Sequence, residues 1–100
     1  MRAPPTISAE EAERIAIAAL GFVAADETLM TRFLSVTGIE AGDIRAAAAD
    51  PGFLAGVLDF LLGHEPDAVA FATEYSLPPE DVLRARAALA GGAPDPWLST

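Results

Sequence analysis

His64 is the only histidine of the 100-residue chain, and it stands next to Glu65 and three residues before Asp67. An imidazole with two carboxylates can hold a divalent metal ion or move a proton. A serine or threonine nucleophile would also depend on this one imidazole. The three residues equally fit the start of a helix, where polar and acidic side chains cap the backbone and meet the helix dipole. We interpret His64 as a capping or solvated residue, and we expect no catalytic residue, no bound metal and no cofactor.

Lysine, cysteine, asparagine and glutamine are missing from the sequence, and all six basic residues are arginine. Without cysteine there is no disulfide, no thiolate nucleophile and no zinc finger. Without lysine there is no Schiff-base chemistry. Fifteen acidic residues give a net charge of -9, which disfavours binding to the phosphates of nucleic acid and to anionic lipid. We therefore expect a protein that is not an enzyme and that binds neither nucleic acid nor a membrane.

Two groups of residues are candidates for binding a partner protein. Glu10, Glu11 and Glu13 form an acidic cluster, which suits either the solvated first turn of a helix or a patch that meets a basic partner. Trp97 and Leu98 follow a glycine pair near the C-terminus. An aromatic side chain after a flexible hinge can dock on its own domain, on a second copy or on another protein.

A helix-turn-helix pattern occurs twice, and its second copy falls over residues 71–85. A DNA-reading helix must present donors to base edges and phosphates. The charged side chains of the last predicted helix are Glu80, Asp81, Arg84 and Arg86. Two arginines are too few cations to bind DNA phosphates. A helix-turn-helix DNA binder is therefore the less favoured alternative.

The longest apolar run covers residues 15–25, whereas a transmembrane helix needs about 20 residues. The residues before this run include three glutamates, where a secretory signal requires positive charge. We expect a cytoplasmic protein.

Helix start signals recur along the chain. Ser8 with Glu11 forms a capping box, Asp26 can cap a second helix, and Asp50 precedes a proline at a first helical position. Apolar residues then recur at helical spacing, and no stretch alternates with the period of a strand. We predict an all-α fold of six short helices, over residues 9–24, 27–37, 41–49, 51–62, 65–75 and 78–90. Large apolar residues go most of the way round the fourth helix, which predicts that it lies at the buried centre.

The sequence matches itself when it is shifted by 38 residues. Phe22 then falls on Phe60, and Phe33 falls on Phe71. A three-helix unit of about 40 residues is too small to bury its own apolar face. We predict two pseudo-repeated three-helix units that share one core. The expected organisation is a flexible N-terminus over 1–7, one helical domain over 8–91 with pseudo-repeats at about 13–50 and 51–88, and a C-terminal tail over 92–100.

Several short strings of the sequence form a recognisable pattern. They are Asp26-Glu27-Thr28-Leu29, Arg32-Phe33-Leu34, Thr37-Gly38-Ile39, Asp43-Ile44-Arg45, Asp50-Pro51-Gly52-Phe53-Leu54, Val57-Leu58-Asp59, Leu61-Leu62 and Glu65. With these strings the sequence resembles a family of short alphaproteobacterial proteins that is catalogued only as a domain of unknown function. The resemblance covers residues 12–90, and its motifs are patterned rather than catalytic. It implies a small, soluble, helical protein of the bacterial cytoplasm and supplies no substrate, cofactor or site.

The favoured function is a non-enzymatic protein–protein interaction or adaptor domain, with another protein or a second copy as partner. It depends on the many apolar positions of the first and fourth helices and on the tail with Trp97. The alternative is an acidic regulatory protein that binds a basic partner protein, and a DNA-binding protein is a candidate for that partner. Binding by charge weakens steeply with added salt, whereas binding by apolar contact does not.

Overall fold

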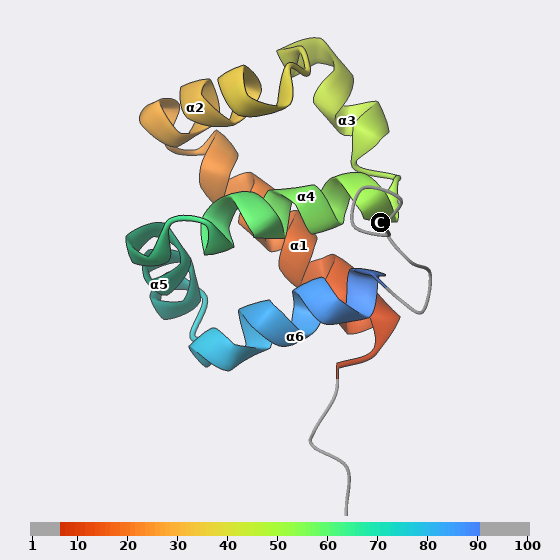
Figure 1. The fold of residues 1–100 in the computed structure, drawn as a ribbon, viewed down its shortest axis with the longest axis vertical. Helices are drawn as coiled ribbons and strands as arrows, with labels where there is room; N and C mark the ends of the chain where they lie inside the picture. The colour runs from red at the N-terminus through yellow and green to blue at the C-terminus, as the bar shows by residue number, and fades with distance from the viewer. Residues whose placement is uncertain (1–6, 91–100) are drawn as a thin grey trace, which may run out of the picture.

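A computed structural model describes residues 7–90 of the chain, which fold into six α-helices and one 3-10 turn (Figure 1). Within these residues there is no strand, so the predicted all-α fold of six helices is confirmed. No helix in this part of the chain combines the length and the apolar character needed to cross a bilayer. The elements are α1 (Ala9–Ala24), α2 (Glu27–Thr37), η1 (Ala41–Asp43), α3 (Ile44–Ala47), α4 (Pro51–Leu62), α5 (Glu65–Glu74) and α6 (Pro79–Ala90).

Side-chain caps fix the predicted starts of three helices. The Ser8 hydroxyl accepts a hydrogen bond from the Glu11 backbone N–H at 3.1 Å. The Asp26 carboxylate accepts from Leu29 N–H at 3.1 Å, and the Asp50 carboxylate accepts from Gly52 N–H at 2.8 Å. Each cap satisfies a backbone donor that the helix itself leaves without a partner.

The third helix is shorter than predicted. Residues 41–49 form η1 and then only four residues of α-helix, Ile44–Ala47. The reason is Asp50, which must be extended (φ -98°, ψ 118°) in order to cap α4. The alanines before it tighten into turns, in which Ala49 N–H bonds the Ala46 carbonyl and Asp50 N–H bonds the Ala47 carbonyl. The cap of α4 overrides the helix propensity of alanine.

The core lies where α1, α4 and α6 pack against one another, with α2 against α1 and α5 against α4 and α6. In Figure 1, α4 crosses the middle of the molecule, as predicted, and α1 runs across it. The side chains that are both large and fully buried come from five helices. They are Val23, Phe33, Val57, Leu58, Leu61, Phe71 and Val82.

Aromatic rings join the two halves of the chain in a reciprocal way. Phe22 meets Phe71 edge-on with ring centroids 5.5 Å apart, and Phe60 meets Phe33 edge-on at 5.3 Å. Phe22 and Phe60 correspond under the 38-residue shift, as do Phe33 and Phe71. In each contact, a ring from the first helix of one half therefore meets a ring from the second helix of the other half. Such edge-on pairs contribute about 0.5–1.5 kcal/mol beyond area burial.

Two further positions 38 residues apart share an unusual backbone. Gly38 (φ 74°) and Ser76 (φ 57°) both have left-handed geometry, and each follows the second helix of its half. The third helices differ, because α3 has no buried residue whereas α6 buries Val82 and Ala85. The duplication itself stays a prediction.

Candidate functional site

The acidic cluster predicted as a partner site lies on the surface. Glu10, Glu11 and Glu13 are all exposed on α1, and none of them forms an ion pair with another described residue. The first two lie in the first turn, where the helix dipole favours carboxylates. The position therefore suits both a solvated helix start and contact with a basic partner.

Trp97 and Leu98, the other predicted partner-binding residues, lie outside the residues that the structure describes.

His64 is held by an ion-paired cluster at the start of α5. Its Nδ1 lies 2.7 Å from Asp67 Oδ2, and the Arg32 guanidinium donates to the same oxygen at 2.8 Å. The Arg32 guanidinium also lies over the Phe60 ring, 5.4 Å from its centroid. His64 is the N-cap residue of α5, yet its side chain makes no capping hydrogen bond. It is half exposed, so the solvated interpretation describes it better than the capping one.

The same cluster disfavours a metal ion at His64. The Asp67 oxygen that would bind the metal already contacts a guanidinium, and a second cation there would be repelled. Among residues 7–90, no three histidine, aspartate and glutamate side chains are grouped so that they could hold a metal ion.

Aspartates and glutamates have different surroundings. Arg84 pairs with Asp81 at 2.8 Å, and Arg86 pairs with Asp59 at 2.6 Å, so these arginines face aspartates. Within residues 7–90, none of the eight glutamates forms an ion pair. The glutamates therefore leave the surface with uncompensated negative charge.

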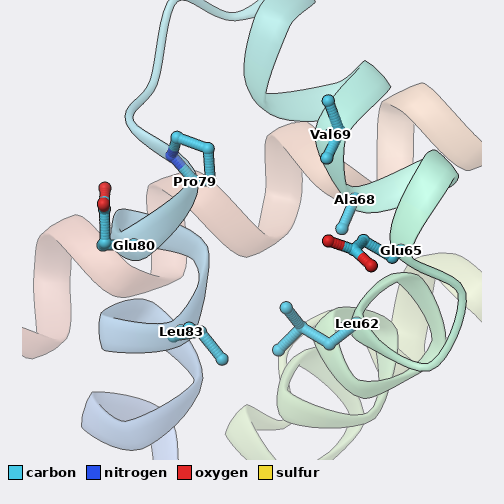
Figure 2. Close-up of a pocket in the computed structure, with 7 residues that line it drawn as sticks. All are labelled: Leu62, Glu65, Ala68, Val69, Pro79, Glu80 and Leu83. Carbon is cyan, nitrogen blue, oxygen red and sulfur yellow. The ribbon is translucent and has the colours of Figure 1, made fainter.

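A groove of about 310 Å³ opens between α5 and α6, above the last residue of α4. In Figure 2, Leu62 and Leu83 point toward one another, and Ala68 and Val69 line the α5 side. The side chain of Glu65 extends toward the space between the helices, and Glu80 stands at the α6 rim. We name this site the α5–α6 groove. Its lining is Leu62, Glu65, Ala68, Val69, Pro79, Glu80 and Leu83.

Two of the five large apolar side chains that are exposed within residues 7–90 line this groove. Val69 is 44% exposed and Leu83 is 59% exposed, although similar residues on the same helices are fully buried. An apolar patch with polar residues at its edge is typical of a binding surface. Glu65 and Glu80 provide that edge and form no ion pair with described residues.

The sequence pattern did not predict this groove. A signal was present, because Leu83 follows Val82 directly and so points about 100° away from it on a helix. Val69 and Phe71 are two residues apart, so they too point in different directions and cannot share one narrow helix face. Which apolar residue stays uncovered depends on how α5 and α6 pack, and the sequence pattern alone does not state it.

Comparison with known proteins adds a family and no function. No curated protein and no solved structure matches the chain significantly. The family model described as "Protein of unknown function (DUF3572)" matches residues 9–92, which include every described helix. With that extent of match, the chain belongs to the DUF3572 family.

Proposed function

We propose that this protein is a non-enzymatic protein–protein interaction domain, and that its α5–α6 groove receives an apolar side chain from another protein. The observation that supports this most is that Val69 and Leu83, both exposed, line one formed groove. Burial of one aliphatic side chain contributes roughly 1.5–3 kcal/mol. A partner that covers the groove therefore gains binding free energy that the isolated domain leaves unused.

The lining of the groove favours binding over catalysis. Its seven residues offer apolar surface and two carboxylates, with no hydroxyl or imidazole for a nucleophile and its base. The arginines of α6 are engaged too, since Arg84 pairs with Asp81 and Arg86 with Asp59. Their engagement supports a protein partner rather than DNA.

Charge favours a different protein over a second copy. Each copy has a net charge of -9. A symmetric contact through the α5–α6 groove would bring Glu65 and Glu80 of one copy toward those of the other, and like charges repel. The tail of the chain is also a poor occupant of the groove, because its one charged side chain, Asp95, is acidic and would be repelled by the same glutamates.

A second candidate is an acidic regulatory protein that meets a basic partner through charge. It is favoured by the glutamates that have no ion pair in residues 7–90, including Glu10, Glu11 and Glu13. That mode predicts affinity that falls steeply with salt, whereas the groove mode retains its apolar part.

Three finer points belong to this proposal. The resemblance noted in the sequence supports a cytoplasmic location and an alphaproteobacterial source. The paired left-handed residues Gly38 and Ser76, with the reciprocal aromatic contacts, support an origin of the two halves by duplication.

A peptide selection tests the proposed function. Random dodecapeptides displayed on phage are selected on the wild-type protein, and the retained peptides are measured against Leu83→Gln and Val36→Gln. Val36 is a matched control, because it is an exposed apolar residue on α2, 70% exposed and outside the groove. Both changes replace an exposed aliphatic side chain without adding charge.

We expect Leu83→Gln to weaken peptide binding at least tenfold, which corresponds to about 1.4 kcal/mol, and Val36→Gln to change it less than twofold. Circular dichroism should show both variants as helical as the wild type, since each position is on the surface. Retained peptides that bind all three proteins equally would contradict the proposal, and so would a selection that retains none.

A further inference from the structure

Two carboxylates line the α5–α6 groove, one from each helix. Glu65 is the first residue of α5, and Glu80 is the second residue of α6. Both are exposed, and neither has an ion-pair partner among residues 7–90. In Figure 2, Glu65 extends toward the space between α5 and α6, whereas the Glu80 carboxylate lies on the outer side of α6, so Glu65 is the carboxylate beside the apolar lining and Glu80 adds negative charge at the edge.

The nearby basic side chains already have partners. Arg32 and His64 both contact Asp67, and Arg84 contacts Asp81 at the start of α6. All three contacts are made to aspartates, and neither of these aspartates lines the groove. The charges of Glu65 and Glu80 are therefore left for a group that comes from outside.

We propose that the segment bound in this groove has an arginine beside its apolar anchor residue, with the anchor against the apolar lining at Leu62 and Leu83 and the guanidinium against Glu65. This inference rests on the proposed function. A guanidinium suits the site better than an ammonium, because its planar fork of donors can bond both oxygens of the Glu65 carboxylate. Its weaker hydration also lowers the cost of placing it beside apolar surface.

The charge pattern argues against other occupants of this groove. An acidic or uncharged segment would leave both glutamates without a partner and would reduce their contact with water. A nucleic acid would place phosphates against them. A basic segment without an apolar side chain would leave Val69 and Leu83 uncovered.

Three synthetic peptides test the inference by isothermal titration calorimetry. They share the apolar anchor found by the phage selection, and the positions on either side of it are arginine, glutamine or glutamate. Each peptide is titrated into the wild type, into Leu83→Gln and into the double variant Glu65→Gln/Glu80→Gln at 50 mM and 500 mM NaCl.

The control is the double variant Glu27→Gln/Glu40→Gln. Glu27 is the first residue of α2, as Glu65 is of α5, and Glu40 is the N-cap of η1. Both are exposed and lie outside the groove lining. The control removes the same number of charges, so it separates contact at the groove from the effect of net charge.

For the wild type at 50 mM NaCl, we expect the arginine peptide to bind about tenfold more tightly than the glutamine peptide, and the glutamate peptide to bind most weakly. The Glu65→Gln/Glu80→Gln variant should remove most of that preference, as should 500 mM NaCl. The Glu27→Gln/Glu40→Gln control should keep at least half of it.

Three contrary results are distinguishable. If the three peptides bind the wild type equally and all of them lose affinity in Leu83→Gln, the groove binds apolar anchors and the inference about arginine is wrong. If Leu83→Gln affects none of them, the proposed function is wrong as well. A preference for arginine that both double variants reduce equally would also overturn the inference, because it would reflect net charge alone.

Discussion

The first half of the chain, α1 to α3, and the second half, α4 to α6, have the same order of elements and differ most in their third helix. α3 has four residues, none of them buried, and packs mainly against η1. α6 has twelve residues and packs against α1, α4 and α5. A groove between second and third helices needs a third helix long enough to lie beside the second, and α6 meets that condition (Figure 1).

The lining of the groove differs between the halves as well. The shift by 38 residues places a polar or small residue of the first half on three lining positions of the second. The pairs are Thr31 with Val69, Gly42 with Glu80, and Arg45 with Leu83. Only the second half therefore combines an apolar lining with acidic residues at its edge, and the proposed binding site lies in that half.

The shared core should respond equally in both halves, and this gives the largest expected effect. Phe33→Ala and Phe71→Ala each remove a fully buried ring. Each should lower the free energy of unfolding by about 3–5 kcal/mol, from lost burial and the cavity left behind. Urea denaturation followed by circular dichroism measures the change. Phe→Leu variants at both positions provide the comparison if the alanine variants fail to fold, and a clear inequality would contradict equivalent roles.

The third helices should respond unequally. Val82 is fully buried on α6, whereas Ile44, its counterpart, is half buried at the start of α3. Val82→Ala should cost about 2 kcal/mol of unfolding free energy, and Ile44→Ala less than about 1 kcal/mol, although isoleucine is the larger residue. Urea midpoints of the two variants decide the point. Equal losses would mean that α3 contributes to the core as much as α6.

The caps of the second helices should also differ. Asp26 caps α2 through its carboxylate, whereas His64, at the same place before α5, makes no such bond. Asp26→Ala should cost about 1 kcal/mol, and His64→Ala about 0.5 kcal/mol or less, since its exposed bond to Asp67 is weak. Thermal unfolding of both variants compares them, and a larger loss at His64 would show that its cluster stabilises the fold.

Similarly small effects, of opposite sign, are expected at the two left-handed residues. Gly38→Ala should destabilise the protein by about 1 kcal/mol, because a side chain disfavours that backbone geometry. Ser76→Gly should stabilise it by about 0.5 kcal/mol, since relief of strain exceeds the added entropy of the unfolded chain. Opposite signs in paired melting curves support equivalent turns, whereas a loss in Ser76→Gly contradicts them.

The sequence predicted the parts of the fold that depend on local chemistry. Ser8, Asp26 and Asp50 each bond a nearby backbone N–H, and those bonds need no tertiary context. The third helix was predicted too long because the need of α4 for its cap competes with alanine propensity. The α5–α6 groove could not be predicted, because Val69 and Leu83 resemble core residues until the packing of α5 and α6 leaves them uncovered.

The most direct test of the account is a chemical-shift map of the arginine peptide on the 15N-labelled protein. The proposed site predicts the largest amide shift changes at residues 62–69 and 79–83, and small changes in α2 and α3. The largest changes in the first turn of α1, or an even spread over both halves, would contradict the assignment of binding to the α5–α6 groove.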